Sequence, residues 1–367
     1  MGRPLRILTW RLHGSYLYYL SHIGHEFYLP VKPGWPVGYQ GRGGAFPWPG
    51  NVHDVPVGQI RKMEFDCVLF QSQQNYLKDQ YEILSPVQQR LPRIYLEHDP
   101  PGEHPTDTRH IVDDPNILLV HVTPFNHLMW DNGRTPTCVI EHGIVIPEGV
   151  SYTGERARGI VVADNLRGRG RRCGSDIFDC IRANVPLDLI GISAKYFGGL
   201  QEIPPREVPA FISEYRFFFT PMRYTSLGLA VCEAMMVGLP IIGLATTEMT
   251  TVIENGVSGY IDTDPLRLVQ YMQELLAAPA EALRMGRCAR RHAQARFNIA
   301  RFTRDWEAAL VDVTGQKGVQ VAINHGESSL PMRQPLRREG IANALDPVSP
   351  LRSTIPPWGE RSLLPNK

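Results

Sequence analysis

Residues 219–240, which read FTPMRYTSLGLAVCEAMMVGLP, contain the side chains best suited to bind a charged ligand. A predicted strand ends at Thr220, a polar turn follows, and a predicted helix opens at Gly228. The free N–H groups and the dipole at a helix start attract anions, and glycine lets a phosphate approach the backbone. Glu233 lies in the apolar part of this helix, where a carboxylate needs a partner. That partner is either an arginine in a structural ion pair or the vicinal hydroxyls of a ribose.

This segment resembles the signature of glycosyltransferase family 4, retaining enzymes of the GT-B fold that use nucleotide-sugars. The family pattern is P-S-x-x-E-G-F-G-L-x-x-x-E-A-M-A-x-G-x-P-V-I. The chain matches it in register at Pro221, Gly228, Leu229, Glu233, Ala234, Met235, Gly238, Pro240 and Ile242. Residues 253–260, IENGVSGY, match the stretch that follows in the family. The resemblance implies that the donor is bound by Ser226, Leu227, Gly228, Leu229 and Glu233.

Two positions depart from the family pattern. The family's first glutamate, eight residues ahead of the second, is Thr225 in this chain. That glutamate is associated with the donor sugar, which makes Thr225 a candidate catalytic position. The family's G-G-x-P-E stretch is replaced by residues 248–251, EMTT, with Thr251 at the place of the glutamate. Because threonine both donates and accepts hydrogen bonds, we expect altered sugar contacts and not a dead site.

A basic turn at residues 167–174, RGRGRRCG, follows the first predicted strand of the second half of the chain. In the resembled family, an arginine and a lysine five residues apart clamp the diphosphate leaving group. Arg167 and Arg172 have this spacing, with arginine in place of lysine. Fixed cations of this kind stabilise a departing diphosphate without a metal ion. A solvated surface turn is the alternative interpretation.

Three further residues are assessed for a role in the site from their positions in the chain. His98 follows a predicted strand, and members of the family often carry a histidine in this region that contacts the donor sugar; a structural histidine is the alternative. Residues 14–26, GSYLYYLSHIGHE, resemble the start of the family, and Gly14 is a candidate for close approach of a phosphate or acceptor. His142, in IEHGI, lies where the family often has asparagine, and we assign it no role.

The elements that position these residues alternate between short apolar strands and helices in two series. Strands separated by single helices pair in parallel through crossover connections, and ligands bind beyond the carboxyl ends of such strands. The pattern predicts an α/β protein with two Rossmann-like doubly wound domains facing across a cleft, as in the GT-B fold. We expect an acceptor-side domain at 1–146, a linker at 147–158 and a nucleotide-sugar-binding domain at 159–317, whose last helix packs back on the first domain. Residues 318–367 are predicted to be a disordered or loosely packed tail.

Composition excludes several classes of protein. The chain has 367 residues with a net charge of +1, whereas nucleic-acid partners usually require a strong positive excess. No stretch reaches the roughly 20 apolar residues of a membrane span, and no secretory signal opens the chain. The six cysteines form no metal-ligand spacing and are predicted to be buried free thiols in a reducing compartment. A dehydrogenase is disfavoured because no G-x-G-x-x-G follows a first strand in either half. We therefore expect a cytoplasmic protein, with peripheral contact at the inner face of the membrane allowed by the sequence, and without metal or cofactor.

The resemblance implies a transferase that moves a hexose-type sugar, with retention, from a nucleotide-diphosphate donor to a saccharide or lipid-linked acceptor. Cell-envelope polysaccharide synthesis is a setting suggested by the resemblance alone. The Pro-, Gly- and Trp-rich residues 32–58 are predicted to form a long irregular loop, and residues 32–48 are candidates for acceptor recognition. Two alternatives stay open. One is a GT-B nucleotide-sugar epimerase, and the other is a non-catalytic nucleotide-binding module, which Thr225 would favour.

Overall fold

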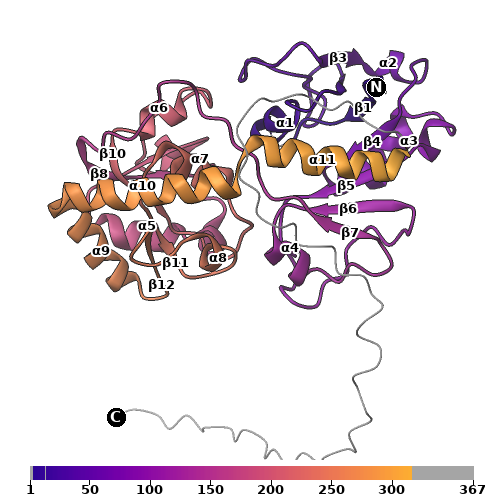
Figure 1. Cartoon of the computed structure of the whole chain (residues 1–367). Helices are drawn as coiled ribbons and strands as arrows, with labels where there is room; N and C mark the ends of the chain where they lie inside the picture. The colour runs from indigo at the N-terminus through magenta and orange to yellow at the C-terminus, as the bar shows by residue number, and fades with distance from the viewer. Residues whose placement is uncertain (1–2, 13, 316–367) are drawn as a thin grey trace, which may run out of the picture. The chain divides into compact units, whose positions relative to one another are not determined.

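The computed structural model describes residues 3–12 and 14–315, which contain two parallel β-sheets (Figure 1). The first sheet has seven strands in the order β3-β2-β1-β4-β5-β6-β7, and every neighbouring pair is parallel. We call this sheet with its helices the N-terminal lobe. Its strands are β1 (Arg6–Thr9), β2 (Glu26–Val31), β3 (Val52–Pro56), β4 (Cys67–Phe70), β5 (Arg93–Glu97), β6 (Ile117–His121) and β7 (Thr137–Val139). Its helices are α1 (Gly14–Leu20), α2 (Val57–Ile60), the π-helix η1 (Asn75–Asp79), α3 (Gln80–Ile83), η2 (Gln88–Arg90) and α4 (Pro124–Met129).

The second sheet has five parallel strands in the order β12-β11-β10-β8-β9, and we call it with its helices the C-terminal lobe. Its strands are β8 (Arg156–Val162), β9 (Leu187–Ile190), β10 (Tyr215–Thr220), β11 (Ile241–Leu244) and β12 (Gly259–Asp262). Its helical segments are η3 (Gly170–Cys173), α5 (Ser175–Arg182), η4 (Ala194–Phe197), α6 (Val208–Ile212), α7 (Leu229–Val237), α8 (Met249–Val252), α9 (Pro265–Ala277) and α10 (Pro279–Arg296). The predicted fold class, two Rossmann-like doubly wound domains, is confirmed.

The central strands are buried along their whole length. Every residue of β4, β6, β10 and β11 is buried, as expected when helices cover both faces of a parallel sheet. This burial explains why the strands appear in the sequence as continuous apolar runs, without alternation.

Each sheet has a point where the strand order reverses. It lies between β1 and β4 in the N-terminal lobe and between β8 and β10 in the C-terminal lobe. The loops that leave the carboxyl ends of these strands diverge and form a crevice in which ligands of this architecture bind. The turns at residues 163–174 and 221–228 therefore flank the predicted binding edge of the C-terminal lobe.

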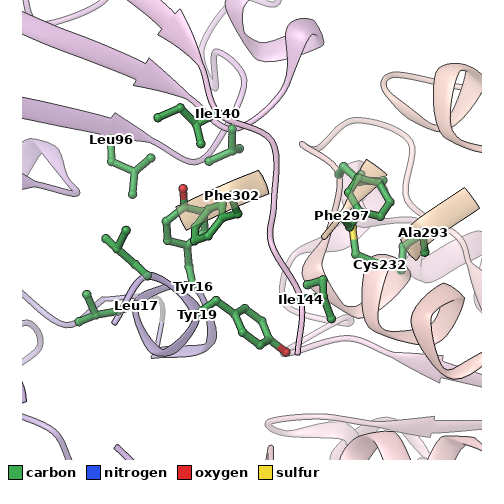
Figure 2. Packing of buried hydrophobic residues seen from close by; sticks show 14 of the residues in the cluster. Tyr16, Leu17, Tyr19, Leu96, Ile140, Ile144, Cys232, Ala293, Phe297 and Phe302 are labelled. Carbon is green, nitrogen blue, oxygen red and sulfur yellow. The ribbon is translucent and has the colours of Figure 1, made fainter. Parts of the chain in front are cut away.

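The chain passes between the lobes twice, and the two crossings are hydrogen-bonded to each other. The N–H of Ile144 donates to the carbonyl of Phe297 over 3.0 Å, and Gly143 leaves no room for a Cβ beside Phe302. The last helix, α11 (Ile299–Thr314), packs against the N-terminal lobe (Figure 1), and its Phe302 lies beside Tyr16 of α1 (Figure 2). Trp306 Nε1 of the same helix donates to Tyr16 Oη over 3.1 Å. One continuous set of buried side chains thus runs from α1 past α11 to α7.

Several details differ from the sequence predictions. The predicted irregular loop at 32–58 contains the edge strand β3, and β8 begins at Arg156, inside the segment predicted as linker. All six cysteines are free, but only Cys67, Cys173 and Cys232 are buried, while Cys180 is exposed. The predicted tail, 318–367, lies outside the described residues.

Candidate functional site

A cavity of about 720 Å³ lies at the carboxyl ends of the strands, with walls from both lobes. The N-terminal lobe contributes α1 and the residues that follow β5, and the C-terminal lobe contributes the turns after β8 and β10 and the start of α7. Most of the predicted site residues come together in this wall. They are His98, Thr225, Ser226, Leu227, Gly228, Leu229 and Glu233.

The start of α7 offers an anion site in this wall. Gly228 precedes the helix in an extended conformation, and no side chain makes a capping hydrogen bond to it. A Cβ on Gly228 would meet no described atom within 4 Å, and the backbone N–H groups of Leu229 and Ala230 make no hydrogen bond with the described residues. The helix dipole adds a partial positive charge at the same point.

The turn ahead of α7 is held in place by the basic turn after β8 and by the start of α5, which follows that turn. Arg223 makes two hydrogen bonds of 2.6 and 2.7 Å to the carboxylate of Asp176, and this pairing lowers the pKa of Asp176 to about 2. The carbonyl of Arg172 accepts from the N–H groups of Arg223 and Tyr224. Gly174, at φ +78°, lets the two turns meet, because a Cβ there would collide with the carbonyl of Pro221.

Glu233 meets a tyrosine of the opposite lobe and not the arginine that an ion pair would require. Tyr19 Oη donates to Glu233 Oε1 over 2.7 Å, and no other described side chain hydrogen-bonds this carboxylate. Burial raises the pKa of Glu233, and the hydrogen bond from Tyr19 opposes that rise. The carboxylate therefore lines the cavity with most of its hydrogen-bonding capacity unused.

His98 lies in the N-terminal part of the wall, directly after β5. Gln71 donates through its amide nitrogen to Thr9 and to the carbonyl of Trp10, which leaves its oxygen as the acceptor for His98. His98 Nε2, 3.2 Å from that oxygen, therefore carries a proton. The edge of the Tyr16 ring packs on the imidazole at 4.9 Å, so its orientation is fixed from two sides.

The arginine of the basic turn that lines the cavity is Arg169. Its side chain makes no hydrogen bond or ion pair with the described residues. Arg167 lies instead at a second, shallower pocket, with its guanidinium 5.7 Å from the ring of Phe197. Arg172 is outside the cavity wall and donates to the carbonyl of Tyr224 over 3.0 Å. The predicted pair is therefore separated from the cavity, and sequence spacing did not single out Arg169.

Gly14 begins α1 but is not part of the wall, to which its neighbour Ser15 belongs. A Cβ on Gly14 would approach the Phe46 ring to 2.9 Å, so glycine makes room for that ring. Phe46 stacks on Tyr18 with ring centroids 5.3 Å apart, and both line the cavity. Part of the predicted acceptor loop thus forms an aromatic section of the wall.

His142 is a wall residue to which the sequence interpretation gave no role. It is 4% exposed, and its Nε2 donates to the carbonyl of Leu227 over 2.8 Å, which ties the lobes together beside the start of α7. Burial lowers the pKa of His142 to about 4, so the ring is neutral near pH 7. In the sequence, a histidine where the resembled family often has asparagine was the signal that could have identified His142 as a residue of the cavity wall.

Thr251, at the place of a family glutamate, is not in the cavity wall. It lies instead beside the crossing of the chain, where Arg296 pairs with Glu248 at 2.9 Å and with Glu141. Within residues 3–12 and 14–315, no group of three or more His, Cys, Asp and Glu side chains is placed to hold a metal ion. Over the same residues, no helix has the length and apolar character required to span a membrane.

Comparison with known proteins bears directly on this site. Residues 191–278 match the family model for glycosyl transferases group 1. The matched stretch contains the turn at 221–228 and the whole of α7, and so carries much of the cavity wall of the C-terminal lobe. No curated protein sequence matches the chain.

Solved structures resemble the chain over both lobes. Sucrose-phosphate synthase from Thermosynechococcus elongatus is 15% identical, with a TM-score of 0.61 over 85% of this chain and 100% of the other. HepE of Anabaena, in complex with UDP and glucose, is 12% identical, with a TM-score of 0.57 over 84% of this chain and 100% of the other. A glycosyltransferase from Rickettsia africae is 10% identical, with a TM-score of 0.56 over 85% and 99%. The fold is that of the GT-B glycosyltransferases. With the family match, it confirms the predicted class of enzyme, a glycosyltransferase.

Proposed function

We propose that the protein transfers a hexose-type sugar from a nucleoside diphosphate to a saccharide or lipid-linked acceptor, with retention at the anomeric carbon. The observation that supports this proposal most is that Glu233 and the uncapped start of α7 line the same cavity. A carboxylate for ribose hydroxyls and an anion site for the diphosphate then lie on one helix, five residues or about 7.5 Å apart along its axis.

We assign the diphosphate to Gly228 and the first turn of α7, in the cavity that Arg169 also lines. As the bond to the sugar breaks, negative charge grows on the diphosphate, and a fixed cation and oriented N–H groups stabilise it. Arg169 takes this role more readily than Arg167 or Arg172, because its side chain lines the cavity without a hydrogen-bonding partner among the described residues. No metal or cofactor is required in this scheme.

His98 and Thr225 are assigned to the donor sugar. His98 comes from the N-terminal lobe and Thr225 from the turn ahead of α7, so the two approach the cavity from opposite lobes. Tyr18 and Phe46 are assigned to the acceptor, because flat rings pack well on the apolar faces of sugars. The resemblance to family 4 supports retention and a role in envelope polysaccharide synthesis, with the enzyme at the inner face of the membrane.

A thermal-shift screen with UDP-, GDP-, ADP- and dTDP-sugars tests the donor class. A ligand at 100 times its dissociation constant adds about 2.7 kcal/mol to the free energy of unfolding. UDP-glucose is the first candidate, since the structurally similar HepE was solved with UDP and glucose. Failure of every nucleotide-sugar to raise the melting temperature would refute the proposal.

Turnover then separates the three candidate activities. A transferase releases free nucleoside diphosphate only when an acceptor is present. An epimerase converts the donor without an acceptor. A non-catalytic module, which the threonine at position 225 favours, binds the donor and leaves it intact.

A further inference from the structure

The hydrogen bond between Tyr19 and Glu233 joins side chains from different lobes, 214 residues apart in sequence. Tyr19 lies on α1 and is 5% exposed, with its ring in the hydrophobic core and its hydroxyl directed away from α1 (Figure 2). The hydroxyl donates to Glu233 Oε1 over 2.7 Å. The rigid buried ring therefore fixes the position of one carboxylate oxygen.

Glu233 retains capacity for a ligand after this bond is made. A carboxylate offers about four acceptor positions on two oxygens, and Tyr19 uses one of them. Among the described residues, no cation and no other donor approaches the carboxylate within hydrogen-bonding distance. Glu233 also lines the cavity, so its unused positions are available to hydroxyl donors there.

We propose that Tyr19 is a positioning residue for the donor: its hydroxyl holds Glu233 in the orientation that accepts hydrogen bonds from the ribose. This inference rests on the proposed function, in which Glu233 binds that ribose. A glutamate side chain loses rotamer freedom when it binds, and a side chain already held in place loses less. The N-terminal lobe thereby contributes to nucleotide affinity through a residue that need not touch the nucleotide.

The test is Tyr19→Phe, which removes the hydroxyl and keeps the buried ring. Affinity is measured for the tightest binder among UDP, GDP and ADP and for its 2′,3′-dideoxy analogue, which lacks the hydroxyls that Glu233 would bind. We expect affinity for the ribonucleotide to fall about threefold to tenfold, the range of one hydrogen bond. Affinity for the dideoxy analogue should change by less than about twofold.

Tyr95→Phe is the matched control. Tyr95 lies on β5 of the same lobe, is 3% exposed and is outside the cavity wall, and its hydroxyl makes no hydrogen bond with the described residues. This variant should bind both nucleotides as the wild type does. Adding Tyr19→Phe to Glu233→Gln should cost less affinity than Tyr19→Phe costs in the wild type, because the group being positioned is already impaired.

An unchanged or tighter ribonucleotide affinity in Tyr19→Phe would overturn the inference, as would an equal loss for the ribonucleotide and the dideoxy analogue. Fully additive losses in the double variant would contradict it too. A Tyr19→Phe chain that no longer folds would assign the hydroxyl a structural role. If Glu233→Gln itself leaves ribonucleotide affinity unchanged, the proposed function fails first. If Glu233→Gln weakens binding and Tyr19→Phe does not, only the positioning role fails.

Discussion

Replacing Glu233 by glutamine is expected to weaken nucleotide binding without loss of the fold. The amide has nearly the same shape, and its oxygen can still accept the 2.7 Å hydrogen bond from Tyr19. The substitution removes the negative charge and one acceptor oxygen. Because a hydrogen bond to a charged group contributes about 1.5–3 kcal/mol, affinity for the nucleoside diphosphate should fall on the order of tenfold to a hundredfold. The nucleotide-sugar should lose the same factor, since both ligands contain the ribose.

The difference in stability between this variant and the wild type should depend on pH in a defined direction. Burial raises the pKa of Glu233 above its ordinary value of 4.5, so the folded chain holds this proton more tightly than the unfolded chain. The resulting stabilisation is present below pH 4.5 and is lost as the pH rises through the folded pKa. Glutamine does not titrate. The melting temperature of Glu233→Gln relative to wild type should therefore increase from acidic to neutral pH.

Calorimetric titration and thermal unfolding on one preparation decide the matter. A variant that melts well below wild type at neutral pH and binds the nucleoside diphosphate with wild-type affinity would refute the reasoning. It would remove Glu233 from the binding site and leave it as a structural partner of Tyr19.

Four further outcomes are expected. Arg169→Ala should weaken nucleoside diphosphate binding about tenfold by calorimetry, and Arg167→Ala by less than about twofold; the opposite order would return the role to Arg167. Gly174→Ala should lower the free energy of unfolding by at least about 1–3 kcal/mol in denaturant titration, because its φ of +78° is unfavourable for alanine; an unchanged midpoint would contradict the close approach to Pro221. Transfer should persist in EDTA, and activity that disappears and returns with Mg²⁺ or Mn²⁺ would show that a metal ion takes part. A chain that ends at Lys317 should keep wild-type nucleotide affinity, and loss of soluble protein would show that the remaining residues stabilise the body.

Local signals in the sequence are strong enough to predict much of the C-terminal lobe. The start of α9, Pro265–Ala277, is one such signal: the Asp264 side chain accepts a 2.9 Å hydrogen bond from the N–H of Leu266, and proline follows at the first turn. The edge strand β3 was missed, since it pairs only with β2 and lies within a Pro- and Gly-rich stretch. An edge strand needs one partner and has a weak apolar pattern.

The candidate site was predictable where one residue carries the signal. Glu233 is visible as a carboxylate in an apolar helix. Arg169 was not, because the backbone of the turn, with Gly170 at φ +59° and a short 3-10 helix after it, decides which arginine lines the cavity. The contact from Tyr19 spans both lobes, and no local pattern encodes it.

The paired crossings of the chain at Ile144 and Phe297 restrict how the two lobes can separate. A single covalent connection would allow the lobes to rotate in any direction, whereas two adjacent connections joined by a hydrogen bond act as a hinge. The relative motion that they permit is opening and closing about this hinge, as in hinged domain closure. Because α11 is packed on α1 through Trp306 and Tyr16, α11 would move together with the N-terminal lobe about this hinge. Opening about this hinge would break the hydrogen bond from Tyr19 to Glu233, and closing would restore it.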